Sequence, residues 1–240
     1  MPGKKPGPLR HSQGNGYIRG EDTRQRITTA AIEVFGEYGF DLATTRQIAT
    51  RAGVNLPALQ YYFENKEGLY HACAEYLSEE GRIFYQPLIM QVQDIHKIGR
   101  EEECIELFCK LLEAILDRIF NNDNSANKRL FLARLQAGLE GPDSAYQILR
   151  ERHGKELYDA ALKLVVRITG RPESEELTHI RTFTLLTQSL MFHHLKKSIF
   201  ESLQWDEIND PRLELLKKTA GMNCRILLKG WVAVHKNDRY

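Results

Sequence analysis

The chain has 240 residues, of which 42% are hydrophobic and 27% charged, and its formal net charge at pH 7 is +1. This composition is typical of a globular protein, and no hydrophobic run approaches the roughly 18 residues of a membrane-spanning helix. The N-terminus has basic residues without a hydrophobic stretch behind them, so it does not resemble a secretory signal. We therefore expect a cytoplasmic protein without membrane partners.

The cysteine pattern does not indicate a metal site or a disulfide framework. No two cysteines form a Cys-x-x-Cys pair, and no histidine cluster has metal-ligand spacing. We expect no cofactor and no metal, with reduced thiols in a hydrophobic core. Enzyme motifs such as Gly-x-Ser-x-Gly, His-Glu-x-x-His and the glycine-rich phosphate loops are also missing from the sequence, so an enzyme is not predicted. The four cysteines are Cys73, Cys104, Cys109 and Cys224.

Residues 1–20 carry a net charge of +4 and no acidic residue. They are rich in glycine and proline and cannot bury much hydrophobic surface, so we expect a disordered basic tail. Two roles stay open for it, an arm that contacts DNA or a solvated tail.

Beyond residue 20 the pattern is helical, and no alternating strand pattern appears. A first helix is predicted to end at Gly39, with a hydrophobic stripe on one side. The residues of that stripe are Ile27, Ala31, Val34, Phe35 and Tyr38.

Residues 44–66, TTRQIATRAGVNLPALQYYFENK, predict two short helices around a tight turn. Thr44 or Thr45 can cap the first helix, because a hydroxyl there accepts a hydrogen bond from a free helical N–H. Gly53 tolerates the left-handed backbone of a helix end, and Asn55 can cap the second helix.

A short helix that follows a tight turn and displays Arg, Gln and Tyr is typical of one that enters the DNA major groove. Arg46 can donate to guanine O6 and N7 or to a phosphate, and Gln60 can read an adenine. Tyr62 and Lys66 are expected to reach phosphates, the alternative for Lys66 being a solvated surface position. The candidate DNA-contacting residues are Thr44, Thr45, Arg46, Gln47, Leu56, Pro57, Ala58, Gln60, Tyr61, Tyr62 and Lys66.

The run from Thr23 to about Leu77 resembles the N-terminal domain of the TetR family of bacterial transcriptional regulators, in AAIEVFGEYGF, TTRQIATRAGV, YYF and NKEGLY. YYFENKEGLYHACAEYL and FHHLKKSIFESLQW are similar to the CecR-like branch of that family. The resemblance implies an all-α fold with a three-helix helix-turn-helix DNA-binding domain at 21–68. A helical effector-binding and dimerisation domain at 69–240 would follow. Gln60 departs from the family pattern, in which this position is often aromatic.

Further helices are predicted along the rest of the chain. A fourth helix starts at Glu64 or Asn65 and is broken or kinked at Pro87. The helices expected after it are 99–120, 126–139, 142–169, 173–200 and one from Pro211 to about Gly230.

The resemblance implies a homodimer on a palindromic operator, with half-sites about 34 Å apart or a multiple of it. The last two predicted helices carry hydrophobic stripes that could pack as a four-helix bundle between subunits, or serve only the intramolecular core. The candidate interface residues are Leu177, Ile180, Leu186, Leu190, Leu213, Leu216, Ala220, Ile226 and Leu227.

The resemblance also implies a small-molecule effector held inside the second domain, so that the protein would be a repressor released from its operator. The alternative is a helical interaction module without sequence-specific DNA binding. Candidate lining residues, each of which could equally be plain core, are Phe108, Leu111, Leu112, Phe131, Arg134, Leu135, Tyr146, Gln188 and Phe192.

Overall fold

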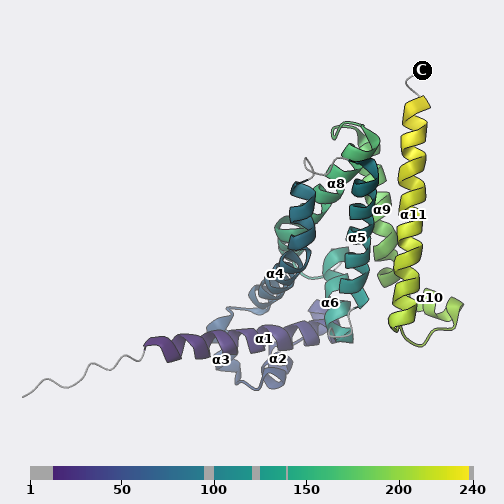
Figure 1. Ribbon diagram of the computed structural model, residues 1–240. Coiled ribbons are helices and arrows are strands. Elements are labelled where there is room, and N and C mark those ends of the chain that lie inside the picture. The colour runs from purple at the N-terminus through teal and green to yellow at the C-terminus, as the bar shows by residue number, and fades with distance from the viewer. Residues whose placement is uncertain (1–12, 95–99, 121–124, 139, 238–240) are drawn as a thin grey trace, which may run out of the picture.

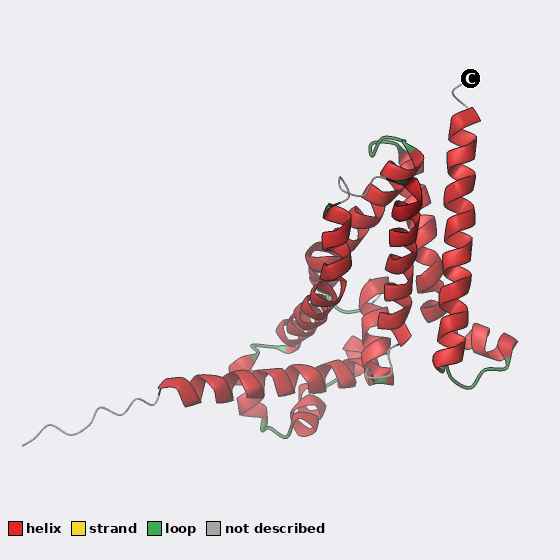
Figure 2. Cartoon of the chain, viewed as in Figure 1, coloured by secondary structure: helices red, strands yellow, loops and turns green. Residues whose placement is uncertain are grey.

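The computed structural model describes residues 13–94, 100–120, 125–138 and 140–237, and within these ranges the chain forms helices and no strand (Figure 2). The predicted all-α fold is confirmed. The elements are α1 Gln13–Leu42, α2 Thr45–Ala52, α3 Leu56–Tyr62, α4 Lys66–Gln93, α5 Glu101–Phe120, α6 Ala126–Ala137, α7 Asp143–Leu149, the π-helical turn η2 Arg150–Gly154, α8 Lys155–Thr169, α9 Glu176–His194, α10 Lys196–Leu203 and α11 Asp210–Asn237.

The helices form a base and an upright body (Figure 1). The long helix α1 lies across the base, with α2 and α3 beneath it. Helix α4 rises from this base, and α5, α8, α9 and α11 pack together in the body. Helix α6 stands on α1, so it joins the base to the body.

Two hydrophobic cores correspond to these two parts. The first lies among α1 to α4 and also takes in side chains of α6 and α7. In it the Tyr70 ring meets Phe35 and Phe131 edge to face, with ring centroids 4.9 Å and 5.0 Å away. The second core lies among the upper part of α4, α5, α8, α9 and α11. The first core therefore extends well beyond the expected domain boundary at residue 68.

Helix α1 differs from its prediction at both ends. It begins at Gln13, so residues 13–20, which were expected to belong to the disordered tail, are helical in the structure. Residues 1–12 lie outside the described residues, and the expected basic arm falls mainly there. At Gly39 the backbone leaves the helical region (φ 77°, ψ 174°), which only glycine adopts easily, and the chain then returns to helix as far as Leu42.

Three later helices have other bounds than their local sequence signals predict. Helix α4 continues through Pro87 to Gln93, so of the two outcomes expected at Pro87, a break or a kink, the break is wrong. The predicted 173–200 helix is interrupted at Leu195, which separates α9 from α10. Helix α11 does not end near Gly230 but continues to Asn237.

Candidate nucleic-acid interface

The helix α2 is held at both ends by its own residues. Thr44 Oγ1 accepts a hydrogen bond from the Gln47 N–H at 3.2 Å, and the Gln47 side-chain oxygen accepts one from the Thr44 N–H at 2.8 Å. This reciprocal capping box satisfies two otherwise free donors. Gly53 closes the helix in the left-handed conformation (φ 64°, ψ 37°). Thr44 is thus the cap, and Thr45 is the first helical residue.

The helix α3 is fixed in the same manner. The Asn55 side chain accepts a hydrogen bond from the Ala58 N–H at 2.8 Å, as predicted. Leu59 points into the first core and is fully buried, as are Ile48 on α2 and Ile27 on α1. These three buried side chains hold the two short helices on α1, and Tyr62 of α3 packs against the same core.

Most of the predicted DNA-contacting residues are exposed on the two short helices. Thr44, the N-cap of α2, is exposed, as are Arg46 and Gln47 on α2 and Pro57 and Gln60 on α3. Tyr61 is 83% exposed, which is unusual for so large a ring. The half-buried members of the set are Thr45, Leu56, Ala58 and Tyr62.

Two of the predicted contacts need correction or restriction. Lys66 donates to the carbonyl oxygens of Phe40, Asp41 and Ala43 at 2.9, 3.3 and 3.3 Å. Its ammonium group has three hydrogens, so these carbonyls at the end of α1 use them all, and the expected phosphate contact does not fit this geometry. The Gln47 amide oxygen is committed to the cap, so a DNA contact would fall to its amide nitrogen.

Two further residues lie beside Arg46, although the sequence analysis did not assign them to DNA binding. A shallow hollow beside Arg46 is lined by Tyr38 and Thr50. Tyr38 was assigned to the buried stripe of α1, but its ring is substantially exposed. Arg51, also on α2, forms an ion pair with Glu37 at 3.2 Å, so its charge is partly neutralised within the protein.

The residues predicted to line one effector pocket fall into separate places. Phe108, Leu111 and Leu112 are buried in the second core, and Phe192 packs against it. Phe131 and Leu135 instead belong to the first core. A single pocket lined by all of the candidates is therefore excluded.

The two remaining polar candidates near α6 also serve the base of the molecule. Arg134 donates to the Phe35 carbonyl oxygen at 3.2 Å and pairs with Glu140 at 3.6 Å. Tyr146 lies over Gly138, at the end of α6. Both side chains therefore contribute to the packing around α6, apart from the second core that holds Phe108.

Helix α9 carries two polar groups with unmet hydrogen-bonding capacity. The Gln188 side-chain nitrogen and the Ser189 hydroxyl are buried without a hydrogen-bond partner among the described residues. Leaving such a group unpaired costs about 1–3 kcal/mol. Gln188 thus stays a candidate, and Ser189 joins it as a residue that periodicity alone did not indicate.

The candidate dimer residues divide by exposure. Leu186, Leu216 and Ala220 are buried in the second core, so their assignment to the interface is wrong. Leu190 and Leu213 are half-buried and pack against the same core. Four of the predicted residues are exposed, and five further large hydrophobic residues are exposed on the same two helices. The exposed large hydrophobic residues of α9 and α11 are Leu177, Ile180, Phe183, Met191, Leu215, Met222, Ile226, Leu227 and Val234.

The described residues were also compared with the requirements of a membrane span and of a metal site. Among them, no helix is long and hydrophobic enough to cross a membrane. Nor do these residues contain a group of three or more His, Cys, Asp or Glu side chains placed to hold a metal ion.

A capped pair of short helices that presents Arg46, Gln60 and Tyr61 outward defines a helix-turn-helix DNA-binding protein. Two family models match the chain. The model for bacterial regulatory proteins of the tetR family matches residues 27–73. The model for the C-terminal domain of the HTH-type transcriptional dual regulator CecR matches residues 104–231, just over half of the chain. The chain belongs to the TetR family of transcriptional regulators, with a CecR-type C-terminal domain.

Individual relatives agree with this assignment. The HTH-type transcriptional dual regulator CecR of Shigella flexneri is 27% identical over 215 residues, which cover 89% of this chain and 94% of the relative. A TetR-family regulator from Mesorhizobium loti has a similar fold, with a TM-score of 0.57, 16% identity, and coverage of 90% of this chain and 98% of that one. The regulator FadR from Bacillus subtilis, in complex with stearoyl-CoA, gives a TM-score of 0.52 at 16% identity, covering 83% and 96%.

Proposed function

We propose that this regulator is a homodimeric repressor that binds a palindromic operator and releases it when a small molecule binds. The observation that carries the proposal is the outward face of α2 and α3, held by caps at Thr44 and Asn55. Residues 21–68 would supply the DNA-binding domain and 69–240 the effector and dimer domain, both within the bacterial cytoplasm.

Base reading would rest on three side chains. Arg46 is exposed at the start of α2, where its guanidinium can donate to guanine O6 and N7. Gln60 is exposed on α3 and can pair with adenine through its amide. Tyr61 can pack against a base edge or the backbone, while the exposed Thr44 and the half-buried Tyr62 are placed for phosphate oxygens.

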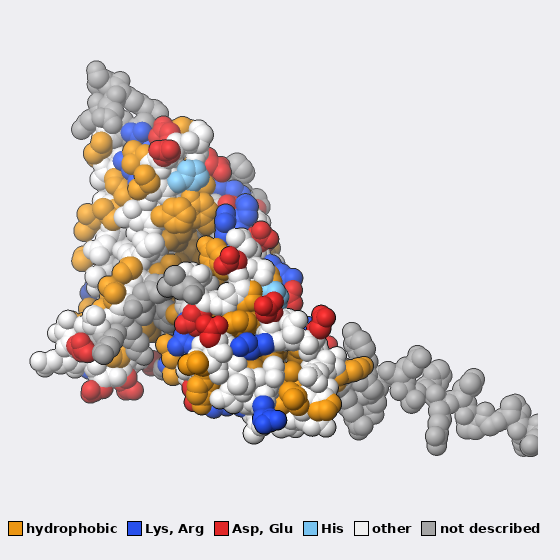
Figure 3. Space-filling model, turned by 180° about the vertical axis from the view of Figure 1, so that it is seen from behind, with side chains coloured by type: hydrophobic (Ala, Val, Ile, Leu, Met, Phe, Trp, Pro, Cys, Tyr) orange, Lys and Arg blue, Asp and Glu red, His pale blue; other side chains and the backbone are white. Residues whose placement is uncertain are grey.

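The dimer would form through α9 and α11. Ile180 and Ile226 are 59% and 63% exposed, although both are strongly hydrophobic. Thr184 and Thr219 on the same helices donate their hydroxyls to the carbonyl oxygens four residues earlier, so they need no other partner. Along the edge that contains α11, Figure 3 shows hydrophobic side chains at the surface. Two such helices from each subunit would bury these side chains as a four-helix bundle.

The effector would lie in the second core, between α5 and α9. Phe108, Leu111 and Leu112 supply a hydrophobic wall there, and Phe192 of α9 packs against the same core. Gln188 and Ser189 supply unused hydrogen-bonding groups. A largely apolar ligand with a hydrogen-bond acceptor would satisfy both, and its polar contacts would set its orientation.

The signal would travel along α4. This helix begins beside the DNA-binding helices at Lys66 and ends in the second core, where Tyr85, Ile89 and Val92 are buried. A ligand that binds more tightly to one tilt of α4 would shift the distance between the two α3 helices of the dimer. Activation instead of repression would use the same geometry with the opposite outcome at the promoter.

Selection from a random duplex DNA pool at a fixed salt concentration tests the proposal. We expect enrichment of an inverted repeat whose half-sites are about 34 Å apart or a multiple of that distance. If the folded protein enriches no sequence even at low salt, the proposal fails. The protein would then act as a helical interaction module.

A further inference from the structure

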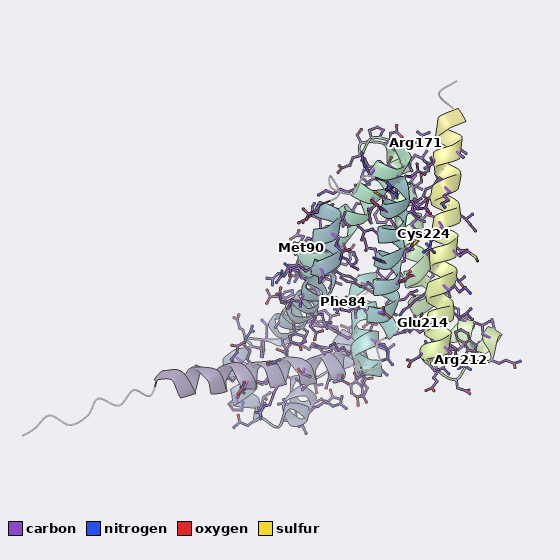
Figure 4. All side chains as sticks on the ribbon, in the orientation of Figure 1. Phe84, Met90, Arg171, Arg212, Glu214 and Cys224 are labelled. Atoms are coloured by element: carbon purple, nitrogen blue, oxygen red, sulfur yellow. The ribbon has the colours of Figure 1, made fainter. Side chains whose placement is uncertain are left out.

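Two cysteines that are far apart in the sequence meet at the contact between α5 and α11. Cys109 is on α5 and Cys224 on α11, and both are buried in the second core. Figure 4 labels Cys224 near the middle of α11, alongside α5. The Cys109 thiol donates to the carbonyl oxygen of Gly221, three residues before Cys224 on α11, at 3.6 Å, and each thiol shifts the pKa of the other. Their sulfur atoms are therefore neighbours across a helix–helix contact.

A cation lies beside this pair. The Arg225 guanidinium donates to both carboxylate oxygens of Glu106, at 2.7 Å and 2.6 Å, and Glu106 is one helical turn before Cys109 on α5. The hydrogen bond from Cys224, with help from Arg225, lowers the pKa of Cys109. The same hydrogen bond, followed by burial, raises the pKa of Cys224. Cys109 thus has the features of an attacking thiol and Cys224 those of a resolving thiol.

The other two cysteines lack this arrangement. Burial raises the pKa of Cys73, whose thiol donates to the Thr28 carbonyl oxygen at 3.6 Å. Burial likewise raises the pKa of Cys104, one and a half turns before Cys109 on α5. Both are buried in the protein, so they serve as matched controls.

We propose that Cys109 and Cys224 form an oxidisable dithiol site, at which a small peroxide is reduced while the two thiols join as a disulfide between α5 and α11. The oxidant must be small, because neither thiol has appreciable exposed surface. Hydrogen peroxide can enter a packed helix interface during local opening, whereas a tripeptide disulfide such as oxidised glutathione is too bulky.

The chemistry balances with peroxide as the oxidant. The Cys109 thiolate attacks one peroxide oxygen, so that an S–O bond forms, the O–O bond breaks, and the leaving hydroxide takes a proton to become water. The Cys224 sulfur then loses its proton and attacks the Cys109 sulfur, which forms the S–S bond and releases the second oxygen as water. In sum the two thiols lose two electrons and two protons, and one peroxide becomes two waters.

The disulfide would change the position of a helix that matters for assembly. An S–S bond is about 2.05 Å long, shorter than any contact between two thiols, so its formation draws α11 towards α5. Since α11 also carries exposed Met222 and Ile226, oxidation would alter the subunit interface and thereby operator affinity. This consequence rests on the proposed function, whereas the disulfide itself does not.

Peptide mapping by mass spectrometry tests the site. The full-length protein is treated with hydrogen peroxide, its remaining thiols are alkylated after unfolding, and the digest is searched for disulfide-linked peptides. We expect a single linked pair, Cys109 with Cys224, and two alkylated cysteines. Cys104→Ala should keep this pair and Cys109→Ala should lose it, with circular dichroism confirming that each variant is folded.

Three results would overturn the proposal: four free thiols in the treated wild-type protein, a disulfide that includes Cys73 or Cys104, or oxidation by glutathione disulfide at the peroxide rate. The wild-type map alone decides the first two results, so the test does not depend on any variant. Operator binding by the reduced protein is measured separately. Failure of that binding counts against the proposed function and leaves the dithiol site standing.

Discussion

A glycine substitution in α1 tests how the base of the molecule is joined to its body. Gly36 lies in the interior of α1, and a Cβ atom added there would come within 1.9 Å of the Asn127 carbonyl oxygen on α6. Alanine has a higher helix propensity than glycine by about 1 kcal/mol. Against this gain, the backbone of α6 would have to move by more than 1 Å to reach an ordinary contact distance.

Overpacking of this kind costs about 3 kcal/mol at the upper end of its usual range. The backbone of α6 cannot rotate away as a flexible side chain could, so we take that upper end. We expect Gly36→Ala to lower the free energy of unfolding by about 2 kcal/mol, the difference between the two terms. Urea denaturation at one fixed protein concentration measures it, because the stability of a dimer depends on concentration.

The matched control is Gly230→Ala in the interior of α11, where an added Cβ atom meets nothing within 4 Å. The same substitution should there stabilise the protein by up to about 1 kcal/mol, because only helix propensity changes. A Gly36→Ala variant as stable as the wild type would contradict the close approach of α1 to α6 at this position.

Three further outcomes follow from the same contacts. Thr44→Ala should destabilise the protein by about 1 kcal/mol in urea denaturation, since the capping box is lost, and Thr45→Ala should cost clearly less. Ile226→Glu should convert the proposed dimer to monomers in analytical ultracentrifugation, whereas Ile83→Glu, at a similarly exposed position on α4, should leave it intact. A dimeric Ile226→Glu variant would exclude this interface. The hydrogen bond from Arg225 on α11 lowers the pKa of Glu106. The contribution of this pair to the stability of the fold is therefore present above the ordinary pKa of 4.5 and is lost as pH falls through the folded-state pKa. Thermal unfolding should therefore show a deficit for Glu106→Gln at pH 7 that shrinks below about pH 4.5, and a deficit independent of pH would contradict it.

The helix-turn-helix could be predicted closely because its signals are local. The caps at Thr44 and Asn55 act on N–H groups three residues away, and Gly53 acts through its own backbone. Neither kind of signal needs information about the rest of the fold. The bounds of α2 and α3 therefore agree with the sequence patterns.

The core or surface against which a hydrophobic stripe packs could not be predicted in the same way. Periodicity shows that Phe108 and Phe131 are buried but not that they belong to different cores. For the same reason Leu186 and Leu216 could not be told apart from the exposed Ile226. Such distinctions depend on which helices pack together.

Lys66 illustrates the corresponding problem for charges. At the start of α4 a lysine beside DNA-reading helices suggests a phosphate contact. The fold brings the last carbonyl groups of α1 to that point, and these carbonyls bind the ammonium group instead. Because α1 and α4 are separated by two helices in the sequence, no local pattern reports this encounter.

The most direct test of operator recognition compares two arginines of α2. Arg46→Ala and Arg51→Ala remove the same charge from the same helix, but we propose that only Arg46 reads a base. Dissociation constants are measured at one salt concentration, on the selected operator and on a scrambled duplex. Arg46→Ala should weaken operator binding by about 1–3 kcal/mol and scrambled-DNA binding by less, since a base contact specifies sequence. Arg51→Ala should change both affinities only slightly, because Arg51 is already paired with Glu37 at 3.2 Å. Equal weakening by the two variants on both duplexes would contradict sequence recognition through this face.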